Sequence, residues 1–418
     1  MNICLFEDER VPKMLPLVYY RPVYDLLCGA ALIKDKIRRQ FPESSLFLHT
    51  RDYLADKVRE ANPGISVNEI PDSLDEMVFI NGRLLPSSDF AARLKDLDSN
   101  TVWAVGKQIA ALKLSGSKLE EIRSAWPRLT FNIEGFYSLK MQDCHEQLVN
   151  YPWQLVEVNG QEIENDFKVL TGNAPQLNGS MSTAAHLVNQ ENIHIAKGAE
   201  IKPGAVLDAQ HGPILIDENS TVMANAVIEG PAYVGKDSLV KAGAKIYEGT
   251  SIGEVCKVGG EIEETIIHSY SNKQHDGFLG HAYLGSWVNL GANTNNSDLK
   301  NNYGEVQVYN DGGWLDTGSM FMGLFMGDHS KSGINTMFNT GTIVGSNSNV
   351  FGAGFPQKYI PSFSWGGGDT RLQEYQLNKA VQTAERVFSR RNVSFSNADK
   401  NLFQSVFEAT APERKQYH

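Results

Sequence analysis

The chain has 418 residues, of which 41% are hydrophobic and 21% are charged. This length suggests two or three domains, and this composition is typical of globular proteins. The formal net charge of -11 argues against a general nucleic-acid-binding protein, because such proteins need a basic surface. The longest apolar run, residues 26–33, is too short to cross a bilayer, and the acidic residues 7–9 do not fit a secretory signal. We therefore expect a cytoplasmic protein that binds neither nucleic acid nor membrane.

The first 110 residues alternate between short apolar segments and helical patterns. Such alternation predicts an α/β fold with a mostly parallel sheet between helices. We expect helices at residues 24–41 and 52–62 and another helix capped by residues 87–89. Ligands of such sheets bind at the C-terminal ends of the strands, which indicates residues 7–10 and 81–83. The expected strands are residues 2–6, 45–49, 77–80 and 101–105.

The four cysteines lie far apart and form no C-x-x-C pair. This spacing argues against a cysteine zinc cluster and against a disulfide framework. Free cysteine behaves mainly as a small buried hydrophobe, so we expect four reduced and mostly buried thiols. They are Cys4, Cys28, Cys144 and Cys256.

Residues 150–190 are interpreted as a connector, and an internal repeat of six residues follows it. Four residues after each of the first seven repeat positions stands a small residue, as at Ser220 and Ala226. A period of six fits neither a helix nor an alternating strand, so it favours a parallel β-helix over ordinary antiparallel strands. The phase slips near residues 211–213 and returns later, with Ser332 as a polar exception. The aliphatic repeat positions are Ile216, Val222, Ile228, Val234, Val240, Ile246, Ile252 and Val258.

Two helices are expected after the repeat, at residues 372–391 and 397–408. The segment 371–418 contains eight basic and five acidic residues, so it is locally positive in an acidic chain. We therefore divide the chain into three parts. Residues 1–175 form the α/β domain with its connector, residues 190–360 the β-helix, and residues 370–418 a helical tail.

The hexapeptide repeat resembles that of the left-handed β-helix acyltransferases, and the left-handedness is implied by this resemblance. An α/β domain ahead of such repeats resembles the bifunctional N-acetylglucosamine-1-phosphate uridyltransferase and glucosamine-1-phosphate N-acetyltransferase family. It is most similar to a divergent branch described as sugar nucleotidyltransferases, with a Rossmann-like first domain. In that family a histidine is followed by an aromatic residue three positions later and then by N-I-G-A-G-T. Here His275, Phe278 and residues 289–292 stand at matching offsets.

The resemblance implies acetyl-CoA-dependent N-acetylation of an amino sugar 1-phosphate, on the route to UDP-N-acetylglucosamine. Glucosamine 1-phosphate is the acceptor that the family implies, although another amino sugar phosphate or a different acceptor stays open. His275 would be the catalytic base, a role that suits imidazole near neutral pH. Asn289 would stabilise the oxyanion together with backbone amides. His268 and His281 flank the motif without matching it and are the other candidates for the base.

The resemblance also implies which residues bind the substrates. Lys241 stands where the family has an arginine, and Lys257 or Lys273 would replace the family's lysine pair. The alternative for each lysine is a solvated surface charge. The family tyrosine is Phe278 here, and Lys300 lies next to the altered N-Y-D-G stretch. Acetyl-CoA would contact the coils of residues 326–350, together with Ala292, Arg390 and Arg391.

The nucleotidyltransferase signature is weaker than the acetyltransferase signature. The family's glycine-rich loop L-x-x-G-x-G-T-R corresponds to residues 5–10, which contain no glycine. Binding of a nucleoside triphosphate would fall to Arg10, Arg21 and the pair Asn81-Gly82. The family has a metal-binding aspartate after N-G, but Arg83 stands there, so Mg²⁺ would need Asp8 or Glu7. The alternative is a degenerate domain.

Two rival functions follow. The first is a transferase with an acetyltransferase β-helix and a nucleotidyltransferase-like domain. The second is a sugar-nucleotide-binding or assembly protein on a β-helix scaffold, with one or both activities lost. Family members are trimers with sites between subunits, so the resemblance implies a homotrimer. The apolar segment 320–325 is the expected outer contact.

Overall fold

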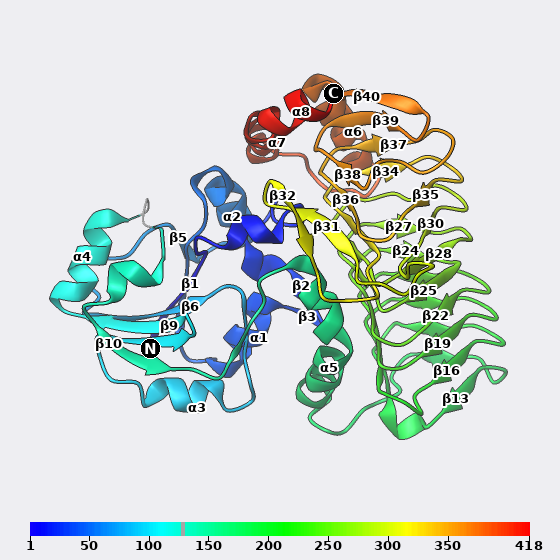
Figure 1. The fold of residues 1–418 in the computed structure, drawn as a ribbon. Coiled ribbons are helices and arrows are strands. Elements are labelled where there is room, and N and C mark those ends of the chain that lie inside the picture. Colours follow the sequence, from blue (N-terminus) through cyan, green and yellow to red (C-terminus); the bar gives the residue numbers. More distant parts are fainter. Residues whose placement is uncertain (127–129) are drawn as a thin grey trace.

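The computed structural model describes residues 1–126 and 130–418. An α/β domain lies on one side and a long β-helix on the other, with helix α5 (Pro152–Thr171) between them (Figure 1). The C-terminal helices sit at the far end of the β-helix and reach back towards the α/β domain. Among the described helices, none is long and apolar enough to cross a membrane. All four cysteines are buried and free, which confirms the expectation for them.

The α/β domain is built on a mixed sheet of seven strands. The four predicted strands are confirmed as β1 (Asn2–Phe6), β4 (Ser45–Leu48), β6 (Glu76–Asn81) and β8 (Thr101–Val105), and β1 pairs in parallel with both β4 and β6. Strand β9 was not predicted and runs antiparallel to both β6 and β8, because the chain reverses directly after β8. The order of strands across the sheet is β10 (Lys140–Asp143), β8 (Thr101–Val105), β9 (Gln108–Ser115), β6 (Glu76–Asn81), β1 (Asn2–Phe6), β4 (Ser45–Leu48) and β5 (Ser66–Val67).

Four α-helices and several 3-10 turns surround this sheet. The helix expected at residues 24–41 is wrong over its first half, where β2 (Leu27–Cys28) and β3 (Ala31–Leu32) form a hairpin. Gly29 turns this hairpin with φ of 69° and packs so closely on α5 that a Cβ would lie 2.7 Å from the Glu162 carbonyl. Asp89 precedes α3 but makes no side-chain capping bond. The α-helices are α1 (Ile33–Gln40), α2 (Ala55–Ala61), α3 (Phe90–Lys95) and α4 (Ser117–Ala125), and the 3-10 helices are η1 (Val11–Met14), η2 (Val23–Asp25), η3 (Asp52–Leu54) and η4 (Ile133–Phe136).

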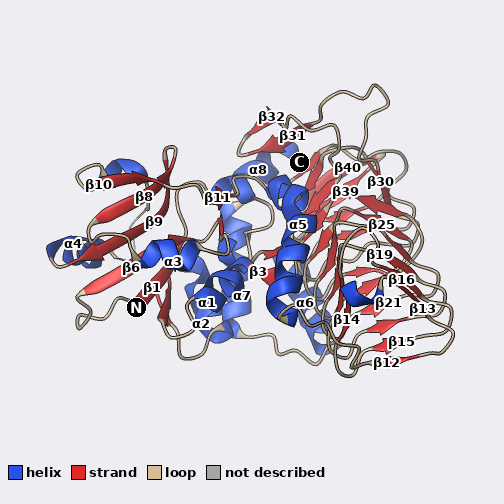
Figure 2. Ribbon diagram, turned by 90° about the horizontal axis from the view of Figure 1, so that it is seen from below, coloured by secondary structure: helices blue, strands red, loops and turns tan. Residues whose placement is uncertain are grey.

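The expected connector is instead the 20-residue helix α5. It begins with Pro152 in its first turn and ends at Gly172, which adopts the left-handed conformation that stops helices. Its buried residues include Trp153, Val156 and Ile163. Figure 2, seen from below, shows α5 lying between the α/β domain and the β-helix. The connector is therefore a packed layer that joins the two domains.

The β-helix has three parallel faces, and the predicted repeat is confirmed. Ile216, Val222 and Ile228 lie on the first, second and third face, and Val234 returns to the first face one coil later. All eight aliphatic repeat residues are at most 1% exposed, so they form the inner core. The seven small residues that follow them are also buried, where the coil turns.

The strands of each face stack in order along the β-helix. The first face contains β14 (Ile193–Ile195), β17 (Ile214–Ile216), β20 (Ala232–Val234), β23 (Thr250–Ile252), β26 (Ile266–Ile267), β29 (Tyr283–Leu284), β33 (Leu324–Met326), β36 (Thr342–Val344) and β38 (Tyr359–Ile360). The second face contains β12 (Ser180–Met181), β15 (Glu200–Ile201), β18 (Thr221–Val222), β21 (Leu239–Val240), β24 (Lys257–Val258) and β27 (Asn272–Lys273), then β34 (Lys331–Ser332), β37 (Asn349–Val350), β39 (Ser364–Gly367) and β40 (Thr370–Glu374). The third face contains β13 (His186–Val188), β16 (Val206–Asp208), β19 (Val227–Glu229), β22 (Lys245–Ile246), β25 (Glu261–Glu263) and β28 (Phe278–Gly280), then β30 (Asn295–Asn296) and β35 (Met337–Phe338).

A long insertion and a helical tail complete the fold. The insertion after β30 carries a hairpin that touches the α/β domain, where Asn310 donates to the Lys13 carbonyl at 2.9 Å. Both predicted tail helices are confirmed, although α6 begins five residues late because residues 370–374 pair as β40. The tail helices are α6 (Leu377–Ser389), α7 (Asn397–Ala409) and α8 (Ala411–Tyr417); the remaining elements are β7 (Leu84–Leu85), β11 (Gln147–Leu148), η5 (Gln190–Asn192), β31 (Gln307–Asn310) and β32 (Gly313–Asp316).

Candidate active sites

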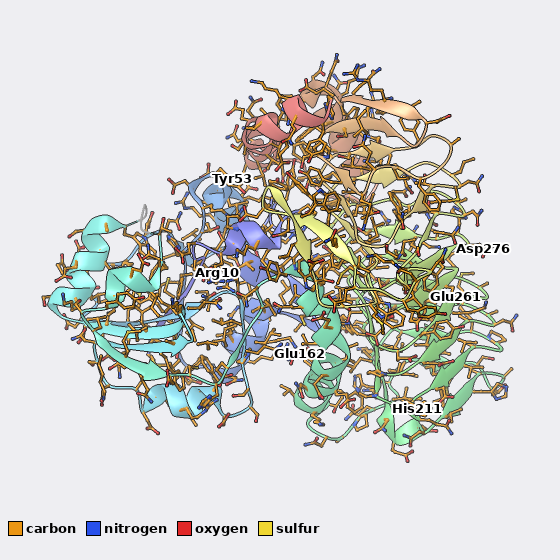
Figure 3. All side chains as sticks on the ribbon, viewed as in Figure 1. Arg10, Tyr53, Glu162, His211, Glu261 and Asp276 are labelled. Carbon is orange, nitrogen blue, oxygen red and sulfur yellow. The ribbon has the colours of Figure 1, made fainter. Side chains whose placement is uncertain are left out.

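His275 lies at the corner between β27 and β28, where the second face of the β-helix turns into the third. Its side chain is exposed, and within the described part of the chain it has no hydrogen-bond or ion-pair partner. Asp276, its neighbour, lies at the edge of the β-helix that points away from the α/β domain (Figure 3). The His275 imidazole is thus free to meet a ligand on the outer surface.

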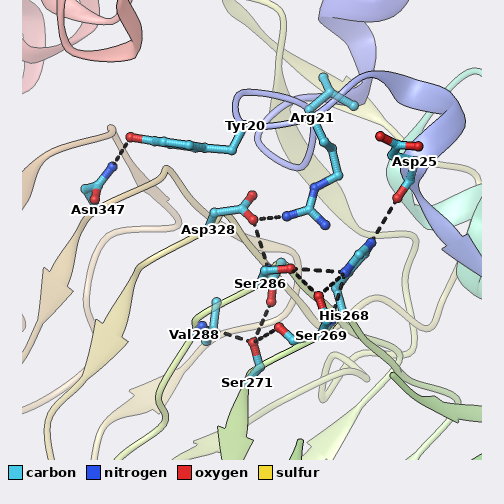
Figure 4. Close-up of polar contacts among 12 residues, drawn as sticks. Tyr20, Arg21, Asp25, His268, Ser269, Ser271, Ser286, Val288, Asp328 and Asn347 are labelled. Atoms are coloured by element: carbon cyan, nitrogen blue, oxygen red, sulfur yellow. Dashed lines mark hydrogen bonds and ion pairs between the residues drawn. The ribbon is translucent and has the colours of Figure 1, made fainter. Parts of the chain in front are cut away.

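His268 is a structural residue, which removes it from the candidates for the base. Its Nε2 lies 2.9 Å from the backbone oxygen of Asp25, and because a carbonyl only accepts, Nε2 carries the proton. Its Nδ1 then accepts from the Ser286 hydroxyl at 3.0 Å (Figure 4). Burial lowers the pKa of His268 well below its usual range, so the ring stays neutral and ties the two domains together.

His281 is also engaged. Its Nδ1 lies 2.9 Å from a carboxylate oxygen of Asp298, and its ring stacks on Phe321 with centroids 5.0 Å apart. The three histidines near the motif therefore differ sharply in their surroundings. Of these three histidines, only His275 has a side chain that bonds no other residue in the described part of the chain.

Asn289 and Ala292 lie one coil beyond His275 on the same part of the surface. Asn289 pairs with Asn272 on one side and with Lys331 on the other. Leu290, the next residue, points into the core, so the alternation of a strand turns the Asn289 side chain outwards. Ala292 is half-buried at the following corner, where its carbonyl accepts from the amide of Asn335 at 2.8 Å.

Four cations gather beside this surface, and we call Lys241, Lys257, Arg390 and Arg391 the cationic cluster. Arg391, at the end of α6, donates to the side-chain oxygen of Asn272 at 2.9 Å, which fixes the tail on the second face. Burial lowers the pKa of Lys257, and the charges of Arg391, Arg390 and Lys241 lower it further. None of the four forms an ion pair with any residue that the structure describes. The cluster is therefore an uncompensated positive site, which suits a phosphate-bearing ligand.

Lys273 is corrected, because it does not reach the surface. It occupies the inward repeat position opposite Val258 and is 1% exposed. Its ammonium donates to the backbone oxygens of His275 and Gly259, the second at 3.3 Å. Burial lowers the pKa of Lys273 to about 8. Lys273 thus shapes the corner that carries His275 and cannot contact a substrate outside.

Phe278 and Lys300 are placed differently from each other. The half-buried Phe278 follows His275 on β28, and its amide donates to Asn295 at 2.8 Å. Lys300 donates to the Glu305 carbonyl inside the insertion. Burial, and then the charge of Lys300, lower the pKa of Lys358, so Lys300 lies near Lys358 on the insertion side. It does not join the cationic cluster in this chain.

The second candidate site is a cleft in the α/β domain. As predicted, the ends of β1 and β6 bring Asp8, Asn81 and Arg83 together. The adjoining end of β4 adds His49, the last residue of the strand predicted at residues 45–49, and Thr50 and Arg51, which follow it; none of the three was predicted as a site residue. The cleft has a volume of about 460 Å³ and is lined by residues 7–9, Val11, Pro12, residues 49–52 and Thr130.

Asp8 does not fit a magnesium ion, which corrects the expectation for it. One carboxylate oxygen accepts from Arg83 Nε at 3.0 Å and from the Arg10 amide at 3.2 Å. The other accepts from Arg83 Nη2 and from Asn81 at 2.9 Å. A carboxylate has about four acceptor positions, so none is left for a metal. No group of three or more metal-binding side chains occurs within residues 1–126 and 130–418.

Glu7 is equally engaged. Its two oxygens accept from the Val23 amide at 2.9 Å, from the Thr50 hydroxyl at 3.0 Å and from three nitrogens of Arg51. Both carboxylates at the end of β1 are thus neutralised by an arginine. Either one would have to break its own ion pair before it could hold a cation.

Arg21, Asn81 and Gly82 are corrected as nucleotide-binding residues. Arg21 is buried and forms an ion pair with Asp328 of the β-helix (Figure 4). The side-chain amide of Asn81 donates its two hydrogen bonds to Asp8 and to the Ile109 carbonyl. A Cβ at Gly82 would lie 2.9 Å from the Tyr24 ring, so this turn is packed and not open to a ligand. Arg10, labelled in Figure 3, is half-buried and stands between the cleft residues Glu9 and Val11 in the chain, so its assignment as a nucleotide-binding residue stays a prediction.

Parts of this chain are similar in sequence to known proteins. Residues 3–174 match a family model described as sugar nucleotidyl transferase. The bifunctional protein GlmU of Rippkaea orientalis is 30% identical over 146 residues, which are 34% of this chain and 27% of that protein. A bifunctional sugar-1-phosphate nucleotidylyltransferase/acetyltransferase of Sulfurisphaera tokodaii is 25% identical over 206 residues, 49% of this chain and 44% of that one. The chain thus spans less than half of these relatives.

A solved UDP-N-acetylglucosamine acyltransferase also aligns, over 58% of this chain and 93% of that one, at 14% identity and a TM-score of 0.27. On the family model and the sequence relatives alone, the chain joins a segment that matches the sugar nucleotidyl transferase family to a hexapeptide β-helix, and it is a distant homologue of the bifunctional nucleotidylyltransferase/acetyltransferases.

Proposed function

We propose that the β-helix transfers an acetyl group from acetyl-CoA to the amine of an amino sugar 1-phosphate, with His275 as the base. The observation that supports this proposal is the pairing of an exposed, unpartnered histidine with an uncompensated cationic cluster on the same surface. Glucosamine 1-phosphate is the acceptor that we favour. The same surface would bind the two phosphate-bearing substrates side by side.

The reaction uses residues at this corner in separate roles. The amine attacks the thioester carbonyl while His275 accepts the proton that the nitrogen loses. The carbon–sulfur bond then breaks, and the leaving thiolate takes that proton, which yields the N-acetyl sugar phosphate and free CoA. The outward Asn289 amide and nearby backbone N–H groups would stabilise the negative charge on the carbonyl oxygen.

The cationic cluster would hold the phosphates. Lys241 and Lys257 lie on successive coils and suit the sugar phosphate as point charges. Arg390 and Arg391, together with the surface at Ala292, suit the phosphates of acetyl-CoA. Because the charges of Arg391, Arg390 and Lys241 are close enough to lower the pKa of Lys257, an anionic ligand would also relieve the repulsion that Lys257 meets.

An acetyl-CoA turnover assay across a panel of amino sugar 1-phosphates tests the proposal. We expect turnover with at least one acceptor, and a decrease in kcat of about 10²–10⁴-fold in His275→Ala at an unchanged Tm. The matched control is His186→Ala, because His186 is exposed on the third face, far from the motif. An unchanged kcat in His275→Ala would remove His275 as the base.

The ion pairs in the cleft of the α/β domain favour a second function, which is binding without catalysis. Glu7 and Asp8 are saturated by arginine and backbone donors, and the turn after β1 contains no glycine. We infer that this domain binds a sugar nucleotide without transferring a nucleotidyl group. In this view only the β-helix is catalytic.

A further inference from the structure

A groove of about 400 Å³ lies at the C-terminal end of the β-helix, between the hairpin β39–β40 and the first turns of α6. It belongs neither to the His275 corner nor to the cleft of the α/β domain. Its lining is unusual in combining two aromatic rings, several glutamine amides and two cations.

The aromatic part is a rigid pair. Trp365 is 43% exposed, and its indole stacks on Tyr375 with centroids 5.3 Å apart and an angle of 26° between the rings. The Tyr375 hydroxyl lies 3.0 Å from the Thr383 hydroxyl of α6, which fixes the ring. A large indole that stays this exposed contributes little to the core, but it offers a π-surface to a flat ligand.

The charged part is positive. Lys379 and Arg386 are exposed and form no ion pair within the described ranges. Glu374, the carboxylate of the groove, is engaged by Arg414 Nε at 2.9 Å. The groove therefore presents two free positive charges beside an aromatic surface, and a neutral sugar would leave both of them unused.

Helix α6 connects this groove to the cationic cluster. Lys379, Gln382 and Arg386 are three and four residues apart and line the groove from one face of the helix, and Arg390 continues the same face. At about 1.5 Å per residue, Lys379 and Arg390 are separated by about 17 Å along the axis. One positively charged face thus runs from Trp365 towards the corner of His275.

We propose that this groove binds an adenine nucleotide. The base stacks on the exposed indole, and a glutamine amide such as Gln382 offers the paired donor and acceptor that match an adenine edge. The phosphates then lie on Lys379 and Arg386. The nucleotide is either a free one or the nucleotide end of coenzyme A, and only the second source rests on the function proposed above.

Binding of ADP, CoA and ribose 5-phosphate to the full chain, measured by calorimetry, tests this proposal. We expect ADP to bind and ribose 5-phosphate to bind at least 10-fold more weakly, because it lacks the base. Trp365→Leu should weaken ADP about 10-fold or more. The matched control is Trp314→Leu, since Trp314 is 56% exposed but lies on hairpin β31–β32. Arg386→Gln should weaken ADP and reduce the dependence on salt.

The outcomes separate the two sources and the two proposals. CoA that binds at least 10-fold more tightly than ADP, with both weakened by Trp365→Leu, indicates coenzyme A, whereas equal affinities indicate a free nucleotide. Absence of acetyl transfer by the wild type with every acceptor, with ADP binding intact, overturns the proposed function and leaves this site standing. Unchanged ADP and CoA binding in Trp365→Leu, with Tm also unchanged, overturns the site.

Discussion

Arg83 stands where the resemblance to the uridyltransferase family led us to expect a metal-binding aspartate. It is 0% exposed and uses all five N–H groups, on Asp8 twice and on Val149, Asn150 and Gln108. A guanidinium that is fully bonded in this way is a structural charge and not a ligand-binding one. The Asp8 carboxylate at the end of β1 is therefore occupied by an internal ion pair.

Removal of this guanidinium should be costly. Arg83→Met leaves the largely buried Asp8 carboxylate without its counter-ion, so we expect a loss of about 3–5 kcal/mol in the free energy of unfolding, measured by urea titration. Asp8→Asn in the same background should recover part of the loss, because it removes the unpaired charge. A loss below 1 kcal/mol in Arg83→Met would contradict the structural role of this pair.

The same geometry predicts how metal affects the α/β domain. Calorimetry with UTP and dTTP should give the same binding in Mg²⁺ as in EDTA, after correction for the metal bound by the free nucleotide, and no pyrophosphate should be released. Asp8→Asn should leave any effect of Mg²⁺ unchanged, because Asp8 has no acceptor position to offer. Pyrophosphate release that disappears in Asp8→Asn would restore Asp8 as a metal ligand.

At the scale of the element, the β-helix tolerates a charge inside one coil. The inward row of the second face runs through Val240 and Val258 to Lys273 and then to Leu290. The Lys273 ammonium bonds the two corner carbonyls that an aliphatic residue would leave unpaired. The corner beneath His275 is thus held by a lysine, at the cost of a buried charge.

This burial predicts a dependence of stability on pH. The pKa of Lys273 falls from 10.5 to about 8 on folding, so between these values the unfolded chain binds a proton that the folded chain lacks. Stability from this group therefore rises with pH across that window. Relative to Lys273→Met, we expect the wild type to gain about 2 kcal/mol between pH 8 and pH 10 in urea titrations.

The comparison with Lys273→Met removes the contributions of other groups. Burial also lowers the pKa of Lys331 to about 8, and this group acts in the same direction in both proteins. A difference between the two proteins that stays constant from pH 7 to pH 10 would show that Lys273 keeps its proton after folding.

At the scale of the whole molecule, the domains share one core. A single hydrophobic cluster runs from the sheet of the α/β domain through α5 to the first face of the β-helix and to α7. Polar bonds cross the same interface, from Arg21 to Asp328 and from Asn347 to Tyr20 at 2.6 Å (Figure 4). Asn159 of α5 bridges both sides, since it bonds Gly29 and Gly249. The two candidate sites are therefore rigidly separated parts of one body.

We propose that this body assembles as a homotrimer. Of the predicted contact segment, Met320 and Phe321 are 46% and 42% exposed, whereas residues 322, 324 and 325 are buried and belong to the core. Ile334 and Met337, at 74% and 39%, add exposed apolar surface later in the same coil. Exposed apolar surface of this kind marks an interface.

Sedimentation at micromolar concentration should show a trimer. The double variant Phe321→Glu with Met337→Glu should shift the protein to the monomer, because it places charges in the apolar contact. Tyr303→Glu is the control, since Tyr303 is 69% exposed on the insertion loop. A monomeric wild type would contradict both the trimer and a site shared between subunits.

The sequence by itself determined the architecture wherever it repeats. The row from Ile216 to Val258 and the small residues that follow predict the three-faced β-helix, because each coil must bury the same kind of residue in the same place. The four main strands and the exposed His275 motif were predicted for a similar reason: each depends on residues close together in the chain. Local pattern and local chemistry agree at these positions.

Only the tertiary structure decided which charged residues are free to bind. Arg21 and Lys273 look like ligand-binding cations in the sequence, but one pairs with Asp328, 307 residues away, and the other points into a coil. Arg390 and Arg391 instead lie near Lys257, because the tail that begins with α6 packs on the second face of the β-helix. The connector became α5 because its apolar side chains meet surfaces from both domains. Ion pairing and burial depend on residues distant in the chain, and a local pattern does not contain them.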